Sequence, residues 1–370
     1  MSNMPIRVLA IVCCLVPGGL EKRLMDIIRN IDRKRVIIDV FTYRIEEGVY
    51  DAEVRNLGGK VYYNPPLNVS NMFWYVKYFK DFLEHHPEYR IIHAHQDAWC
   101  GVFCKGAYLA KVPVRIAHSR TALAGINIQH LAKDLIKLST RRYANYYFAV
   151  SKNAAIWLFG IQRYKNGEIT ILPNSIDTDS FIFDESTRIR VRKENNWDNK
   201  FIVIHVGNIT PPKNHEFIIK VFSAVAQYNK DAVLVLVGGG EQYRLRKIIE
   251  DLSLEEQIEF LGLRNDVGEL LQASDVFLFP SKFEGLPGAL IEAQASGIPC
   301  VVSDRIPDEA IISPNVQVLS LNEDIEKWSQ AVLEQKHYCR KLGKQSIEKN
   351  KYDIESLVKW LMSFYEEVYR

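Results

Sequence analysis

Residues 278–303 read LFPSKFEGLPGALIEAQASGIPCVVS, which is the pattern of a strand, a loop, a helix and a second strand. The apolar residues up to Phe279 and the run 299–303 are the expected strands. Pro287 is the expected first residue of the helix. An N–H group at that position has no partner within the helix, so proline, which has no N–H group, loses nothing there. Gly297 suits the residue that follows the helix. Units of this kind build parallel α/β sheets.

Two glutamates mark this stretch. Glu284 lies in the loop, and Glu292 lies more than one turn inside the expected helix. A helix start offers free N–H groups and a partial positive charge to a phosphate, and Glu292 could accept hydrogen bonds from hydroxyls below it. A ligand with both a phosphate and vicinal diols, such as a nucleotide sugar, fits this arrangement. The spacing alone does not distinguish it from two glutamates placed by chance.

The composition is that of a folded protein with more than one domain. The chain has 370 residues, 47% hydrophobic and 25% charged, and its length predicts about two or three domains. A net charge of +2 gives no reason to expect a nucleic-acid partner. Six cysteines, none in a C-x-x-C motif, are expected to be reduced thiols of a cytoplasmic protein.

An apolar run near the start, residues 8–16, superficially resembles a signal peptide. It lacks a small-x-small cleavage site and continues through Pro17 into a helical pattern, so a first buried strand explains it better. No run is long enough to span a membrane.

Strands and helices alternate along the chain, and the series starts twice. This predicts an α/β protein with two doubly wound, Rossmann-like domains, residues 1–177 and 178–352, which face each other across a cleft. An amphipathic helix over 353–370 is expected to pack back on the first domain. The expected strands are 6–12, 36–42, 60–63, 91–94, 114–118, 147–150, 169–172, 201–207, 233–237, 258–261, 276–280 and 300–303. The expected helices are 20–30, 71–85, 99–110, 127–142, 152–159, 185–196, 213–228, 241–252, 266–272, 287–296 and one that starts near 323.

The first domain has polar or glycine-rich residues where strands end. Gly18 and Gly19 follow the first strand, where they either let a ligand approach closely or form a tight turn. His118 ends the fifth strand and can orient or exchange protons near neutral pH, unless it is a surface histidine. His93 and His95 point to the same strand face, but no third metal ligand has a suitable spacing, so we expect no metal site.

The second domain repeats this arrangement in its first three loops. Gly207 allows a phosphate to approach, and Lys213, at the start of a helix, can bring a positive charge to it. Gly238 lies in a glycine-rich loop that is neither a dinucleotide fingerprint nor a Walker motif. The backbone around Leu263 could hold the edge of a base, while Arg264 contacts the ligand or is a solvated surface charge.

Taken together, these motifs resemble a known family. The chain is similar over essentially its whole length to retaining glycosyltransferases of the GT-B fold, glycosyltransferase family 4-like, in the bacterial group that builds exopolysaccharide, capsule and related glycans. The segments that carry the resemblance are PGGLEKRLMDIIRNID, LGGKVYYNP, IIHAHQDAWCG, VRIAHSRT, ILPNSIDTDSF, HVGNITPPKNH, VGGGE, FLGLRNDV and SDVFLFPSKFEGLPGALIEAQASGIPCVVSD. The Glu-x7-Glu spacing of the last is highly specific, and the second to fourth are most similar to exopolysaccharide-type members.

The resemblance implies roles for individual residues. Glu292 would hold the ribose hydroxyls, Glu284 the sugar, and Lys213 the diphosphate. His118 would lie at the sugar, so the implied catalytic residues are His118, Lys213 and Glu284. The implied donor-binding residues are Gly18, Gly19, Gly207, Asn208, Lys213, Gly238, Leu263, Arg264, Glu284, Gly285, Leu286, Pro287 and Glu292. The family generally needs no divalent metal, so we expect no metal and no cofactor beyond the nucleotide sugar as co-substrate.

One residue departs from the family pattern. Members usually have an arginine after the glycine at position 207, and this chain has Asn208. A neutral amide cannot replace the bidentate grip of arginine on phosphate at equal strength. Three consequences stay open: donor binding is weaker, the protein no longer catalyses, or another cation takes over. The candidate cations are Arg264, Lys282 and Arg305.

The resemblance predicts a retaining transfer of a hexose or N-acetylhexosamine from a nucleotide sugar, expected to be a UDP-sugar. The expected acceptor is a glycan or lipid-linked glycan of surface polysaccharide biosynthesis. Two alternatives are a sugar-nucleotide epimerase of the same fold and a non-catalytic or partner-dependent subunit, which Asn208 motivates.

The expected location is cytoplasmic, and a peripheral position at the inner face of the cell membrane stays open. The helix NMFWYVKYFKDFL combines aromatic residues with Lys77 and Lys80, which suits an anionic membrane surface. We favour the alternative that these aromatic residues form the buried face of an ordinary helix. Membrane contact, if present, would involve the N-terminal domain.

Overall fold

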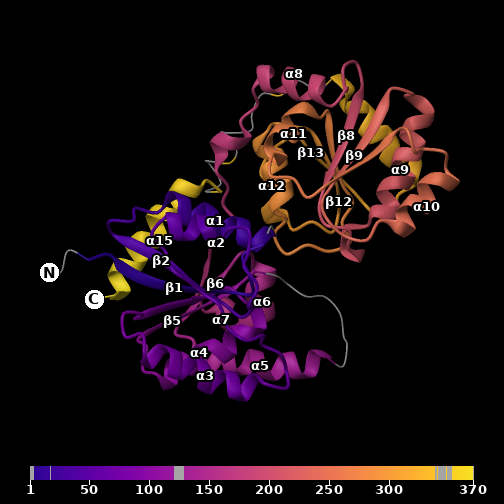
Figure 1. The fold of residues 1–370 in the computed structure, drawn as a ribbon. Helices are drawn as coiled ribbons and strands as arrows, with labels where there is room; N and C mark the ends of the chain where they lie inside the picture. Colours follow the sequence, from indigo (N-terminus) through magenta and orange to yellow (C-terminus); the bar gives the residue numbers. More distant parts are fainter. Residues whose placement is uncertain are drawn as a thin grey trace. The chain divides into compact units, whose positions relative to one another are not determined.

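The computed structural model describes residues 4–16, 18–120, 129–337, 340, 347 and 352–369 (Figure 1). The chain forms two compact units, Met1–Ser175 with Ile354–Arg370, and Ile176–Asp353. Each unit has its own parallel sheet covered by helices, so the predicted α/β architecture with two doubly wound sheets is confirmed.

The first unit is built on a seven-stranded sheet in the order β3-β2-β1-β4-β5-β6-β7. The sheet is doubly wound, because the chain runs outward from β1 to β3 and then returns to build β4 to β7 on the other side. The run Ile6–Val12 is apolar apart from Arg7, because both faces of a central parallel strand are covered. The strands are β1 (Ile6–Val12), β2 (Val36–Thr42), β3 (Val61–Tyr62), β4 (Ile91–Ala94), β5 (Val114–Ser119), β6 (Tyr146–Ala149) and β7 (Ile169–Ile171).

Helices cover both faces of this sheet, with α1 and α15 on one face and α3 to α5 on the other (Figure 1). The C-terminal helix α15 joins the core of this unit, although the sequence alone left that crossover open. Its buried residues recur at helical spacing, so one apolar stripe faces the sheet: Ile354, Val358, Leu361, Met362 and Tyr365. The helices are α1 (Gly19–Asn30), α2 (Asp51–Asn56), α3 (Met72–Glu84), α4 (Cys100–Leu109), α5 (Gln129–Tyr143), α6 (Lys152–Phe159), α7 (Ile161–Lys165) and α15 (Ile354–Tyr369).

The second unit has a six-stranded sheet in the order β10-β9-β8-β11-β12-β13. The loops that follow β10, β9, β8 and β11 therefore lie next to one another at the carboxyl edge of the sheet. The strands are β8 (Phe201–Val206), β9 (Ala232–Val237), β10 (Ile258–Gly262), β11 (Val276–Phe279), β12 (Cys300–Ser303) and β13 (Val316–Leu319). The helices are α8 (Glu185–Glu194), α9 (His215–Tyr228), α10 (Tyr243–Asp251), α11 (Val267–Ala273), α12 (Gly288–Ala295) and α13 (Ile325–Leu333).

Two helix starts differ from the sequence prediction. Pro287 is the residue before α12 and not its first residue, whereas Gly297 does follow the helix, with a φ of 67°. Lys213 lies in the short 3-10 turn Pro211–Lys213 and not in α9. The reason is Asn214, whose left-handed backbone (φ 61°, ψ 41°) separates the turn from the helix, and whose side chain donates to the Pro280 carbonyl at 3.1 Å.

Three short elements were not predicted, namely α2, α7 and β13. The residues 127 and 128 of one expected helix lie outside the described part of the chain. None of the helices in that described part combines the length and apolar composition that crossing a membrane requires.

Candidate active site

The glycine loops of the second unit are joined by backbone hydrogen bonds. The Gly207 N–H donates to the Val237 carbonyl, and the Gly238 N–H donates to the Gly262 carbonyl, both at 2.8 Å. A Cβ at position 238 would lie 2.3 Å from the Gly207 carbonyl oxygen, and Gly238 has a φ of 145°. Only glycine fits there, so part of the glycine signal reflects the close packing of loops against each other.

Asn208 contributes to this packing. Its side-chain oxygen accepts a hydrogen bond from the Gly239 N–H at 3.0 Å, and the Ile209 N–H donates to the Gly239 carbonyl at 2.7 Å. Asn208 therefore links the loops after β8 and β9. This bond gives the residue a structural role in the place where the family usually has an arginine.

Lys213 and Glu284 form an ion pair at the carboxyl ends of the adjacent strands β8 and β11. The Lys213 Nζ lies 2.7 Å from Glu284 Oε1, and both side chains are largely buried. The same Nζ lies 4.7 Å from the centre of the Phe279 ring, which adds a cation–π contact. A Cβ at position 207 would lie 3.2 Å from the Lys213 side chain, so Gly207 leaves room for the lysine. The structure thus brings together two of the three predicted catalytic residues.

The helix α12 follows this ion pair. The residue before the helix, Pro287, makes no side-chain capping hydrogen bond to its first N–H groups. Glu292 lies just over one turn inside the helix and is 4% exposed. Leu286 is buried and Gly285 is half-buried in the loop between Glu284 and the helix.

The candidate substitutes for the missing arginine differ in their surroundings. Arg264 is paired with Asp266, with 2.7 Å between Nε and Oδ1, and the neighbouring Leu263 side chain is 60% exposed. Arg305 lies 3.4 Å from Asp304. Lys282 is exposed and has no ion pair among the described residues, so it is the most available of the three cations.

In the first unit, His118 belongs to a cluster of three buried histidines. In the parallel pairing of β4 with β5, Ala94 is opposite Ala117, so His95 lies beside His118. One ring nitrogen from each of His93, His95 and His118 lies within 4.8 Å of the others, and in number and spacing the cluster could hold a metal ion. The expectation that no third ligand of suitable placement accompanies His93 and His95 was wrong, because His118 comes from the neighbouring strand.

Hydrogen bonds occupy most of the ring nitrogens in this cluster. The Tyr365 hydroxyl lies 2.7 Å from His93 Nδ1, and His93 Nε2 lies 3.0 Å from His118 Nδ1. Arg120 donates to His95 Nδ1 at 2.9 Å. His118 is 3% exposed, and its Nε2 has no hydrogen-bond partner in the described chain. Burial, and the positive charge of Arg120, lower the pKa of all three histidines well below 6.5.

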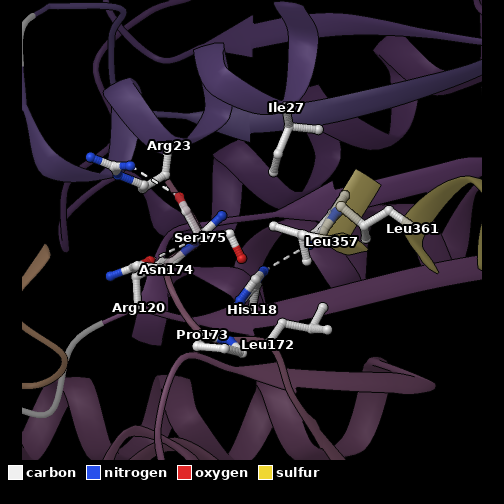
Figure 2. A pocket seen from close by; sticks show the side chains of 11 residues that line it. Arg23, Ile27, His118, Arg120, Leu172, Pro173, Asn174, Ser175, Leu357 and Leu361 are labelled. Carbon is white, nitrogen blue, oxygen red and sulfur yellow. Dashed lines mark hydrogen bonds between the residues drawn. The ribbon is translucent and has the colours of Figure 1, made fainter. Parts of the chain in front are cut away.

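His118 and His93 line a small cavity of about 10 Å³, shown in Figure 2. The cavity lies between α1, the segment 172–175 and α15. Its polar wall includes Arg120, whose guanidinium donates to the Asn174 side-chain oxygen at 3.2 Å, and Arg23, which donates to the Ser175 carbonyl at 3.0 Å. Sequence reasoning assigned no site role to Arg23, Arg120 or Tyr365, although Arg23 and Arg120 lie in segments that carry the family resemblance.

The two glycines after β1 have different surroundings. A Cβ at Gly18 would lie 2.4 Å from Glu21 Oε2, whereas nothing lies within 4 Å of the Cβ position at Gly19. Gly19 is exposed at the start of α1, and Glu21 is half-buried in the first turn, where burial raises the pKa of its carboxyl group. The Glu21 carboxylate is the end of a flexible side chain and can move, so packing does not require glycine at position 18, and Gly19 leaves open space at the helix start.

Comparison with known families gives a match in each half of the chain. Residues 17–180 match the Glycosyltransferase Family 4 model, and residues 187–349 match Glycosyl transferases group 1. The chain is also 30% identical to the putative glycosyltransferase EpsF of Bacillus subtilis, over 99% of this chain and 97% of the relative. The chain belongs to the family 4-like glycosyltransferases. It is a hexosyltransferase with the two-domain GT-B fold.

A second relative and a solved structure extend this comparison. The glycosyltransferase is 28% identical to the N,N'-diacetylbacillosaminyl-diphospho-undecaprenol alpha-1,3-N-acetylgalactosaminyltransferase of Campylobacter jejuni, over 76% of each chain. Its fold is similar to that of HepE from Anabaena, solved in complex with UDP-glucose, with a TM-score of 0.81 and 20% identity, over 98% of this chain and 99% of HepE.

Proposed function

We propose that this glycosyltransferase moves a hexose or N-acetylhexosamine from a UDP-sugar, with retained configuration, to a glycan or lipid-linked glycan of surface polysaccharide biosynthesis. The observation that carries the proposal is the Lys213–Glu284 pair, which lies between the glycine loops and the uncapped start of α12. HepE, solved with UDP-glucose, supports the donor class, and the named acceptor of the Campylobacter jejuni relative supports a lipid-linked acceptor.

Each part of the proposed donor has a matching group in the second unit. The ribose hydroxyls are neutral and can donate to the buried carboxylate of Glu292. The diphosphate is anionic and suits both the Lys213 ammonium group and the N–H groups at the start of α12. Glu284 and the backbone of residues 285 and 286 would hold the sugar. The ion pair with Glu284 already holds the Lys213 ammonium group in position. Donor binding would therefore bring the phosphate to a positive charge whose position is fixed before the donor arrives.

The proposed reaction breaks the bond between the anomeric carbon and the oxygen of the diphosphate. The acceptor hydroxyl oxygen bonds to the same face of that carbon, and its proton passes to an oxygen of the leaving diphosphate. No covalent enzyme intermediate is needed. Lys213 and the α12 start would stabilise the charge that develops on the leaving group, and this type of interaction is worth about 10²–10³ in rate. Since they supply positive charge, we propose that transfer needs no divalent metal.

The structural role of Asn208 bears on the alternative of a non-catalytic subunit. Its bond to the Gly239 N–H gives the amide a structural role without assuming a loss of activity. We infer that the remaining positive charge at the phosphates comes from Lys213, with Lys282 as the second available cation.

We also propose peripheral membrane contact through α3. Tyr75 and Phe79 face the core, as expected if the aromatic residues form the buried face of an ordinary helix. Phe73, however, is 72% exposed and Trp74 is 51% exposed. The exposed Lys77 accompanies them. Exposed aromatic residues beside a lysine suit the interface of an anionic membrane, where lipid-linked sugars are located.

The experiment that tests the donor site is a thermal-shift panel of nucleotide sugars with Glu292→Ala. Wild-type protein should be stabilised by UDP and by one or more UDP-sugars, and the variant should lose that stabilisation. Glu250→Ala, at an exposed position of α10, is the matched control. Undiminished stabilisation of Glu292→Ala would refute the donor site.

Turnover assays separate the remaining possibilities. Transfer to an acceptor, with an unchanged rate after metal removal by EDTA, is the expected result. Conversion of the sugar without transfer would identify an epimerase. Turnover that requires a second protein would identify a partner-dependent subunit.

A further inference from the structure

The buried histidines of the first unit form a continuous chain of hydrogen bonds, and two of them, His93 and His118, line the cavity. This chain of hydrogen bonds runs from the Tyr365 hydroxyl on α15, through both nitrogens of His93, to Nδ1 of His118. The far nitrogen of His118, Nε2, is buried, lacks a partner in the described chain, and belongs to a side chain that lines the cavity (Figure 2). An unpaired buried polar atom is costly, so its position calls for a ligand or a water molecule.

The Tyr365 hydroxyl indicates which atom donates in each hydrogen bond of this chain. A tyrosine hydroxyl has one proton to donate, and the one partner of the Tyr365 hydroxyl among the described residues is His93 Nδ1. If Nδ1 of His93 accepts, a neutral His93 carries its proton on Nε2 and donates it to His118 Nδ1. A neutral His118 then carries its own proton on Nε2.

We propose that Tyr365 and His93 are positioning residues that hold His118 as its neutral Nε2–H tautomer, so that His118 donates a hydrogen bond to an oxygen atom of the substrate. The substrate part of this inference rests on the proposed function, while the tautomer does not. The oxygen belongs to a hydroxyl of the transferred sugar or of the acceptor. His118 therefore orients the substrate and does not take a proton from it, because Nε2 already carries one and the Nδ1 lone pair is occupied.

Arg120 keeps this arrangement neutral. A guanidinium group can only donate, so His95 Nδ1 must accept, and His95 also carries its proton on Nε2. The ring of His95 stacks on that of His93, with 4.0 Å between the ring centres. Burial lowers the pKa of Arg120 to about 10, which still leaves it charged at neutral pH. A proton added to any of the three rings would place a second positive charge beside it.

The same hydrogen bonds oppose metal binding by the cluster. A metal ion needs the lone pair of a neutral imidazole nitrogen. The lone pairs of His93, His118 and His95 are each taken, by Tyr365, His93 and Arg120 respectively. A divalent ion would have to displace these donors and would lie beside the Arg120 charge.

The direct test is nitrogen-15 NMR of histidine-labelled full-length protein, because the ring nitrogen shifts distinguish the two neutral tautomers and need no substrate. The nine histidines can be assigned with single His→Gln variants. His93 and His118 should both be Nε2–H tautomers in the wild type, and Tyr365→Phe should shift His118 toward a mixture. A wild-type His118 protonated on Nδ1 would overturn the proposal, as would a stoichiometric metal bound to the cluster.

Kinetics provide the second measurement. Tyr365→Phe keeps the ring and removes one hydrogen bond, so kcat should fall about two- to tenfold. Tyr75→Phe is the matched control, since Tyr75 is equally buried and its hydroxyl has no partner in the described chain. An unchanged kcat in Tyr365→Phe with an altered tautomer would refute the substrate contact. If no nucleotide sugar is turned over at all, the proposed function fails while the NMR result still stands.

Discussion

The two units present their candidate functional residues in opposite ways. The second unit uses charge and backbone, with a lysine–glutamate pair, glycine loops and the start of a helix. The first unit uses neutral side chains, three buried histidines held by Tyr365 and Arg120. Both sets lie at the carboxyl ends of parallel strands, where doubly wound folds bind ligands.

This difference corresponds to the two kinds of chemistry that glycosyl transfer requires. A diphosphate leaving group develops charge, which needs positive charge that is in place before the reaction. Sugar and acceptor hydroxyls are neutral and need donors and acceptors of fixed direction. A charged histidine would not serve this second purpose, because it loses the lone pair that fixes its orientation in the chain of hydrogen bonds.

The largest expected effect comes from removing the charge of the second unit. Lys213→Met should lower kcat about 10²–10³-fold, because it removes the proposed main source of positive charge at the leaving diphosphate. The measurement is UDP release at saturating donor and acceptor. The control is Lys220→Met, an exposed lysine on α9. A loss of less than tenfold would show that Lys213 is not the main source of charge stabilisation.

The next effect concerns the one residue that departs from the family pattern. Asn208→Arg adds a charged donor and should strengthen UDP binding at least about tenfold, since hydrogen bonds to charged groups contribute about 1.5–3 kcal/mol. It also removes the bond to the Gly239 N–H, so the ligand-free variant should unfold at a lower temperature. Calorimetric titration with UDP measures the first effect. Unchanged affinity would mean that position 208 does not face phosphate.

Sequence reasoning succeeded where a feature is local in the chain. The bounds of β1, β4 and β12 follow from their apolar runs. The four loops of the second unit were also recognised, because each follows directly on a strand. The prediction failed at Lys213, where the left-handed Asn214 depends on a contact with the Pro280 carbonyl that only the fold creates.

The histidine cluster was missed for a related reason. His93 and His95 share one strand, but His118 joins them only because β4 and β5 pair in a particular register. Tyr365 comes from the other end of the chain, on a helix whose amphipathic pattern predicts burial but not its partner. To predict a set of residues that strand pairing brings together, one must know the order of the strands, and the patterns in a single sequence do not reveal that order.

A smaller effect is expected when the pH is lowered, and it concerns the free energy of unfolding. Burial lowers the pKa of His93, His95, His118 and His205 well below 6.5, and that of His215 to about 4. Below pH 6.5 the unfolded chain therefore binds protons that the folded chain does not. The free energy of unfolding should fall by up to about 1.4 kcal/mol per buried histidine for each pH unit, beginning near pH 6.5.

Urea unfolding at pH 7.5, 6.5 and 5.5 measures this dependence. His118→Gln and His205→Gln should each reduce the slope, and the two variants separate the contributions of the two units. His85→Gln, at an exposed position of the first unit, is the control. Equal stability at all three pH values would contradict the neutral state of the buried histidines.

The smallest expected effect is on the proposed membrane contact, for which the first unit would again rely on uncharged side chains with only modest help from charge. Replacing Phe73 and Trp74 together by serine should weaken binding to vesicles that contain anionic lipid about fivefold, roughly 1 kcal/mol, because part of each ring leaves the interface. Salt should weaken the remaining binding through Lys77. Tyr243→Ser, an equally exposed aromatic residue on α10, is the control in co-sedimentation. If wild type and the double variant sediment equally, α3 does not contact the membrane, and its exposed rings need another explanation.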